Sequence, residues 1–323
     1  IRAFSRTSLL PKLLPLCRGV LWLMAHFAPA EDLLCLESSD ALSAGALGFM
    51  PRILVITTLP HRRPESHRFA RVNGRHTLRM RAPRRIGLPY GVYPRLLLAY
   101  LTTQAVRTKS PEIQIGATPN DLARKLGLSV ISGPRGTATR LQEQLRRLLS
   151  MRLEWQTSLG LAPRSSGYAF VSPSGHLRLK PLRGLRPRRP TWRSQIKLGQ
   201  PFFAEITHSA VPIDLRAIRH LQRSPLAIDL YVWLTYRMSY LKKPTLIPWQ
   251  SLEAQFGADY GRLRDFKRRF LSHLADVLQA YPAARLSDQA TGLLLLPSPT
   301  HLPRATGRAS RLTRREPPQS SSR

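Results

Sequence analysis

The sequence predicts an α+β fold that is mainly α-helical and contains two tandem modules of the same design. The stretch Ile247–Leu286 reads as a short helix, a turn, a longer basic helix and the start of a strand. The same order occurs upstream, from Thr118 to Gln156, and in both stretches apolar residues recur every three or four positions. Each module therefore combines a helical bundle, a helix-turn-helix and a β-hairpin, which is the arrangement of a winged helix.

The downstream module has the more distinct pattern. Pro248 suits the first helical position, and Leu252 and Phe256 lie four apart on one face of a short helix. We expect Gly257 to end this helix in a left-handed conformation. A second helix begins at Leu263, and its inward stripe is apolar: Phe266, Phe270, Leu274 and Val277.

Other elements are expected from periodicity and turn residues. In chain order they are a helix at Glu31–Ala46, a strand at Arg52–Leu59, a hairpin turning at Asn73-Gly74, helices at Tyr93–Val106, Thr118–Gly127 and Thr137–Ser150, a strand from Met151, two helices within Asp214–Leu241 broken near Ser224-Pro225, and paired strands at Ala284–Leu286 and Gly292–Pro297.

These elements divide the chain into five parts. The modules are expected at residues 45–157 and 194–300, joined by a flexible, basic, Pro- and Ser-rich linker at 158–193. Residues 1–44 are expected to be partly disordered or to precede the native start, for which Met24 is the candidate. Residues 301–323 are expected to form a disordered basic tail.

The charge of the chain indicates its kind of partner. Among 323 residues, 51 are Lys or Arg and 18 are Asp or Glu, which gives a formal net charge of +33. Because such an excess repels itself in a compact protein, we expect a polyanion, and nucleic-acid phosphates are the usual one. A basic surface without a specific partner is the alternative, but the charge coincides with the helix-turn-helix patterns.

Cysteine usage and hydropathy indicate a cytoplasmic protein without a membrane partner. Cys17 and Cys35 are the only cysteines, so a disulfide scaffold or structural zinc site is not expected. Leu13–Ala30 superficially resembles a signal peptide, but Arg18 interrupts its apolar run. No apolar span is long enough to cross a membrane.

The motifs of catalysis are absent from the sequence. Gly133 and Gly136 lack the Lys-Ser/Thr ending of a phosphate-binding loop, and we interpret them as turn residues. The nine histidines are scattered, and neither HExxH nor G-x-S-x-G occurs. The sequence therefore predicts a protein that is not an enzyme and has no cofactor, catalytic residue or metal site.

The candidate contacts are those of nucleic-acid recognition. In a helix-turn-helix, the N-terminal part of the second helix contacts base edges and flanking groups contact phosphates. The downstream candidates are Arg262, Arg264, Asp265, Lys267 and Arg268, and the upstream candidates are Arg135, Thr137, Thr139, Arg140 and Glu143. The alternative is a solvated helix face with local ion pairs, such as Arg262 or Arg269 with Asp265.

Three long stretches resemble a known family. GLPYGVYPRLLLAYLTTQAVRTKSPEI, HSAVPIDLRAIRHLQRSPLAIDLYVWLTYRMSYL and PTLIPWQSLEAQFGADYGRLRDFKRRFL are similar to plasmid replication initiators of the RepA family, as is the upstream GALGFMPRILVITTLPHRR. The resemblance covers roughly 45–155 and 196–299, whereas Ser158–Arg193 departs from the family's acidic, Trp- and Asp-rich pattern.

The resemblance implies two winged helices that bind repeated double-stranded sites, called iterons, at a plasmid origin. It also implies recruitment of host replication proteins without intrinsic catalysis, and initiators of this kind can form homodimers that repress their own promoter. Two other classes remain open: a winged-helix transcriptional regulator, and a nicking or priming enzyme. Origin melting separates the first from an initiator, and cleavage of supercoiled origin DNA identifies the second.

Overall fold

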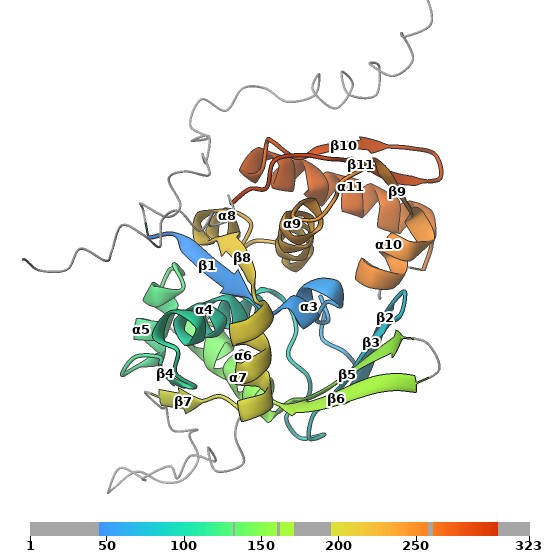
Figure 1. The fold of residues 1–323 in the computed structure, drawn as a ribbon. Helices are drawn as coiled ribbons and strands as arrows, with labels where there is room; N and C mark the ends of the chain where they lie inside the picture. The colour runs from blue at the N-terminus through green and yellow to red at the C-terminus, as the bar shows by residue number, and fades with distance from the viewer. Residues whose placement is uncertain (1–44, 132, 160–161, 171–194, 258–260, 303–323) are drawn as a thin grey trace, which may run out of the picture.

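The computed structural model describes residues 45–131, 133–159, 162–170, 195–257 and 261–302 (Figure 1). All but the last two residues of the expected helix at Glu31–Ala46, the basic tail beyond residue 302 and most of the expected linker lie outside the described residues. Residues 45 and 46 are not helical.

The fold is α+β, as the sequence predicts. The helices of the described residues are α3 (Arg52–Ile56), α4 (Val92–Thr108), α5 (Pro119–Lys125), α6 (Thr137–Ser150), α7 (Gln200–Ser209), α8 (Leu215–His220), α9 (Pro225–Met238), α10 (Trp249–Phe256) and α11 (Leu263–Ala280). The strands form small antiparallel sheets rather than one continuous sheet.

Four such sheets occur in the described part of the chain. They are the pair β1 (Leu47–Met50) and β8 (Val211–Asp214), the pair β4 (Glu112–Gln114) and β7 (Gln195–Lys197), the sheet of β2 (Arg68–Asn73), β3 (His76–Arg81), β5 (Arg152–Leu159) and β6 (Ala162–Ala169), and the sheet of β10 (Arg285–Asp288), β11 (Gly292–Leu296) and β9 (Thr245–Pro248).

Both two-stranded pairs join segments far apart in the sequence. Leu47 lies opposite Asp214 in one, and Ile113 lies opposite Ile196 in the other. In Figure 1, α4 to α7 lie together at the lower left, and α10, α11 and the β9–β11 sheet lie at the upper right. The helices α3 and α9 lie between these groups, and the buried apolar residues of both halves form one continuous core.

The expected helices α4, α5, α6, α8, α9, α10 and α11 are confirmed. Local capping explains why several begin where they do. The Thr118 hydroxyl accepts a hydrogen bond from the Asp121 backbone amide, and the Asp121 carboxylate accepts one from the Thr118 amide. At α9, the Ser224 hydroxyl accepts from the Ala227 amide, and Pro225 occupies the first turn.

The prediction of a strand over Arg52–Leu59 was wrong. Residues Arg52–Ile56 form α3, which begins after Pro51, and the Thr57 hydroxyl closes its last turn by donating to the Ile53 carbonyl at 2.7 Å. This short segment packs against α9 and is largely buried, so burial outweighs its β-branched composition.

The expected left-handed conformation of Gly257 was also wrong. Its φ is −103°, within the range of any residue, whereas Gly127 at the end of α5 has a φ of +70°. Glycine is required at position 257 by space, because an added Cβ would lie 2.9 Å from both the Glu253 carbonyl oxygen and a Phe266 ring carbon.

Residues 162–169 form the strand β6, so the prediction of a flexible linker was wrong for this segment. This strand pairs with β5 along its whole length, from Arg152 opposite Ala169 to Leu159 opposite Ala162. The hairpin expected at Asn73-Gly74 is confirmed as β2 and β3, and the paired strands after α11 are confirmed as β10 and β11. The helix α7 and the strands β1, β4, β7, β8 and β9 were missed.

Candidate nucleic-acid interface

The N-terminal half of α11 presents a basic surface opposite its buried stripe. Phe266, Phe270, Leu274 and Val277 are buried, as their spacing predicts. The exposed side is arginine-rich and consists of Arg262, Arg264, Arg268 and Arg269. Arg262, Arg264 and Arg269 form no ion pair or side-chain hydrogen bond with another described residue, so their guanidinium groups are open to an anionic partner.

Asp265 and Arg268 form a local pair on the same surface. A nitrogen of the Arg268 guanidinium lies 3.2 Å from the Asp265 Oδ1, and 80% of the Arg268 side chain is exposed. An exposed pair one helical turn apart contributes little to stability. Arg268 is therefore able to exchange this carboxylate for an external acceptor.

Lys267 is held by the protein itself. Its ammonium group lies 2.8 Å from Asp288 Oδ1 at the end of β10, and 4.8 Å from the centre of the Trp249 ring at the start of α10. Trp249 in turn donates from Nε1 to the Gln289 carbonyl at 3.1 Å. Lys267 thus links α11 to the β10–β11 hairpin, whereas the sequence predicted that it contacts DNA.

The upstream candidates lie around the turn between α5 and α6. Thr137 is buried and its hydroxyl donates to the Ser129 carbonyl at 2.7 Å, while the Thr139 hydroxyl donates to the Gly133 carbonyl at 3.1 Å. Both threonines therefore shape the turn. Arg135 and Arg140 are exposed, and neither forms an ion pair or side-chain hydrogen bond with another described residue.

Glu143 belongs to a packing cluster. It accepts a hydrogen bond from the buried guanidinium of Arg147 at 2.7 Å, and Arg147 also donates to the Leu88 carbonyl at 3.2 Å. The ring of Tyr90 lies 5.3 Å from this guanidinium. Arg147 therefore holds α6 against the chain segment before α4, and Glu143 orients the Arg147 guanidinium from the same helix. Among the upstream candidates, only Arg135 and Arg140 present open cations.

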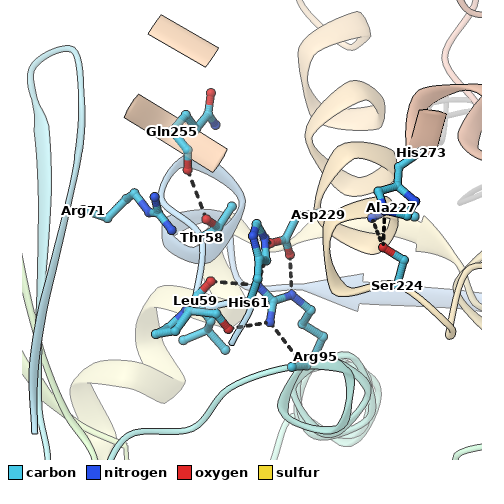
Figure 2. A network of polar contacts seen from close by, with 12 residues as sticks. Thr58, Leu59, His61, Arg71, Arg95, Ser224, Ala227, Asp229, Gln255 and His273 are labelled. Atoms are coloured by element: carbon cyan, nitrogen blue, oxygen red, sulfur yellow. Dashed lines mark hydrogen bonds and ion pairs between the residues drawn. The ribbon is translucent and has the colours of Figure 1, made fainter. Parts of the chain in front are cut away.

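A buried ion pair sets the two halves of the protein relative to each other (Figure 2). Arg95 on α4 is 2% exposed, and it donates from Nε and Nη2 to the two carboxylate oxygens of Asp229 on α9, at 2.7 and 2.6 Å. The remaining donors reach the carbonyls of Leu59, Pro60 and Gly91. This bidentate geometry satisfies the guanidinium and the carboxylate together.

His61 completes this network. Its Nε2 lies 2.8 Å from Asp229 Oδ2. Burial lowers the pKa of His61, and the nearby charge of Arg95 adds to this effect against the raising effect of Asp229. Burial would raise the pKa of Asp229, but Arg95 and the hydrogen bonds from His61 and Arg95 hold it below its usual value. The lowered pKa values of both residues are consistent with a neutral His61 imidazole that donates a hydrogen bond to an ionised Asp229 carboxylate.

A second contact fixes α10, and with it the helix-turn-helix. The Thr58 hydroxyl donates to the Gln255 carbonyl at 3.1 Å, and the Gln255 side-chain amide donates to the Ile56 carbonyl at 3.0 Å. Figure 2 shows Gln255 facing Thr58 across the junction. The orientation of α10 and α11 is thus set by residues almost two hundred positions earlier in the chain.

Membrane spans and metal-binding clusters are both absent from the described residues. No described helix is long and apolar enough to span a membrane. No group of three or more His, Cys, Asp or Glu side chains in the described ranges is arranged to hold a metal ion.

The fold and this surface define a strongly basic α+β protein with exposed arginines on the first turns of α11 that are unpaired among the described residues. A model of the family of plasmid-encoded RepA proteins matches residues 88–250, about half of the chain. The chain therefore belongs to this family of replication initiators.

Among solved structures, the chain is similar to the crystal structure of selenomethionine derivatives of domains 2 and 3 of RctB. The TM-score is 0.45 and the sequence identity is 12%, over 76% of this chain and 98% of that chain. No curated protein matches the chain.

Proposed function

We propose that this protein initiates plasmid replication by binding repeated double-stranded sites (iterons) at the origin with two winged-helix modules. The observation that carries the proposal is the arginine surface on the first turns of α11, which the β10–β11 hairpin flanks as a wing. A helix in this position reaches base edges in the major groove, and arginine can donate two hydrogen bonds to one guanine.

The two modules have different roles in this proposal. The downstream helix α11 supplies the main base readout through Arg264 and Arg268. The upstream helix α6 supplies a second contact through Arg135 and Arg140, or a surface for a homodimer. The bound protein acts in the cytoplasm as a scaffold for host replication proteins, and it has no catalytic activity of its own.

Replacing Arg264 and Arg268 with alanine tests the base readout. Removing each base-reading guanidinium is expected to lower the affinity for the cognate origin by about 1–3 kcal/mol and to leave binding to random duplex DNA much less affected. Titration of both DNAs at one salt concentration measures this difference, and a footprint on the origin locates the site. The variant K242A/K243A is the control, because it removes two exposed cations from the loop before β9.

An equal loss of affinity for cognate and random DNA would reassign both arginines to phosphate binding. Two cheaper observations separate the alternatives. A transcriptional regulator would bind the origin repeats without melting them or supporting plasmid replication. A nicking enzyme would relax supercoiled origin DNA when Mg²⁺ is added, whereas we expect the DNA to remain supercoiled.

A further inference from the structure

One face of the four-stranded sheet carries a row of arginines outside both helix-turn-helix elements. Arg68 on β2 lies opposite Arg81 on β3, and Arg81 lies opposite Arg152 on β5. Residues directly opposite in antiparallel strands project to the same side of the sheet. The three guanidinium groups therefore form one line across three neighbouring strands, which we call the arginine row.

The arginine row is exposed, and its charges are not neutralised by the described part of the protein. All three side chains are exposed, and none forms an ion pair or side-chain hydrogen bond with a described residue. Arg79 lies two residues from Arg81 on the same face, and its charge is already paired. Its guanidinium lies 3.9 Å from the Glu154 carboxylate and donates a hydrogen bond to the Gln156 side chain at 2.9 Å. The opposite face is packed, with Leu78, Met80 and Leu153 buried.

Like charges directly opposite in a sheet destabilise it, so the arginine row costs the free protein stability. Arg68 and Arg81 come from the β2–β3 hairpin, and Arg152 follows α6 by two residues, so the fold assembles the row from distant segments. A linear polyanion laid across the strands would relieve this repulsion by neutralising several cations at once.

We propose that the arginine row binds the phosphodiester backbone of duplex DNA, as a sequence-independent contact in addition to the base-reading helices. The inference rests on the proposed DNA-binding function. Single-stranded nucleic acid is recognised mainly by aromatic side chains that stack on bases. The described side chains on this face are Arg68, Ala70, Val72, Thr77, Arg79, Arg81, Arg152, Glu154, Gln156 and Ser158, and none of them is aromatic.

Charge reversal of the central arginine separates this role from a structural one. In R81E the new carboxylate lies between Arg68 and Arg152, so we expect a higher unfolding midpoint together with weaker binding of duplex DNA. Lys243 is exposed in the loop before β9, and K243E makes the same charge change away from the sheet. Both variants are compared with the unaltered full chain by thermal unfolding and by titration with origin and random duplexes.

A neutral triple variant measures how many phosphates the arginine row binds. The slope of log affinity against log salt falls by about 0.9 for each phosphate that the protein no longer neutralises, so R68Q/R81Q/R152Q should lower its magnitude by roughly 2–3. The matched control is K109Q/K242Q/K243Q, which removes three exposed lysines elsewhere. The ratio of affinities for origin and random DNA should stay unchanged, because binding to phosphates carries no sequence information.

The proposal is overturned if the salt slope of the triple variant equals that of its control. It is also overturned if the triple variant unfolds at a lower temperature than its control, since the arginines would then support the fold. A change in oligomeric state with an unchanged slope would assign the row to self-association instead. Equal affinity of the unaltered protein for origin and random DNA would refute the proposed iteron readout, and the salt slopes would still test the row.

Discussion

At the scale of single residues, the buried polar groups at the junction behave differently from the exposed arginines. His61 and Asp229 are enclosed and share a hydrogen bond, and each has a pKa set by burial and by Arg95. Arg264, by contrast, is exposed to solvent, and its side chain pairs with no other described residue. The buried polar groups stabilise the packing of the two halves against each other, and the exposed arginines remain available for a partner.

The pKa shift of His61 predicts loss of stability on acidification. Its pKa is lower in the folded protein than the usual value of 6.5, so the folded state binds fewer protons between those two values. The free energy of unfolding should therefore fall as pH drops below about 6.5, by at most about 1.4 kcal/mol per pH unit for this one group. His76, whose pKa is also lowered by burial, adds to the trend.

Denaturant unfolding of H61Q between pH 7.5 and 5.5 measures the contribution of His61. Glutamine retains a donor for Asp229 but does not titrate, so the dependence on pH should be weaker than in the unaltered protein. H220Q, which alters an exposed histidine, should leave the dependence unchanged. Equal pH dependence in H61Q and the unaltered protein would show that His61 is protonated in the same way in both states.

At the scale of elements, α10 and α11 depend on one close approach in the turn between them. Position 257 has room only for hydrogen, since a Cβ would lie 2.9 Å from the Glu253 carbonyl oxygen and from the Phe266 ring. G257A should therefore lower the free energy of unfolding by about 1–3 kcal/mol through overpacking. It should also weaken origin binding, because Phe266 positions the exposed face of α11.

Gly261, in the same turn, provides a matched control. No atom of the described residues lies within 4 Å of a Cβ added there, and its φ lies outside the left-handed range. G261A should be neutral or stabilise the protein by up to about 1 kcal/mol, through a smaller unfolded-state entropy. Thermal or denaturant unfolding of both variants checks the contrast, and equal effects of the two substitutions would contradict it.

Among the elements, long amphipathic helices were the most predictable. The Leu141, Leu145 and Leu148 repeat predicted α6, and the Phe266, Phe270 and Leu274 repeat predicted α11, because one side of each helix packs on the core. The segment Arg52–Ile56 was misassigned because a short apolar run lacks a period long enough to separate strand from helix. Strands of three or four residues, such as β4 and β7, were missed because distant partners create them.

At the scale of the whole molecule, the pair of Arg95 and Asp229 links the two halves. Removing one partner leaves the other buried and charged, so D229A should lower the free energy of unfolding by about 3–5 kcal/mol. The double variant R95M/D229L should recover much of this loss, because it removes both charges and retains side-chain volume. Denaturant unfolding of the three proteins measures the difference.

The control for this comparison is D276A. Asp276 is half exposed, and its only ion pair among the described residues is a 3.5 Å contact with His273 on the same helix. Its removal should change the free energy of unfolding by less than about 1 kcal/mol. A similar small effect of D229A would show that the junction does not depend on the buried pair.

The sequence by itself determined the helices α4, α5, α6, α8, α9, α10 and α11, the basic character and the family, because periodicity, capping and composition are local properties of the chain. It also marked the exposed arginines of α11, since residues opposite an apolar stripe face solvent. Only the tertiary structure decided that Lys267, Thr137, Thr139 and Glu143 make contacts within the protein. The partners of Lys267, Thr137 and Thr139 lie in other elements or in the turn, so no local pattern specifies them. Glu143 pairs with Arg147 four residues later on α6, and the fold holds the Arg147 guanidinium at the Leu88 carbonyl. The same reason applies to the Arg95–Asp229 pair and to the arginine row, which exist only because folding places distant strands and helices side by side.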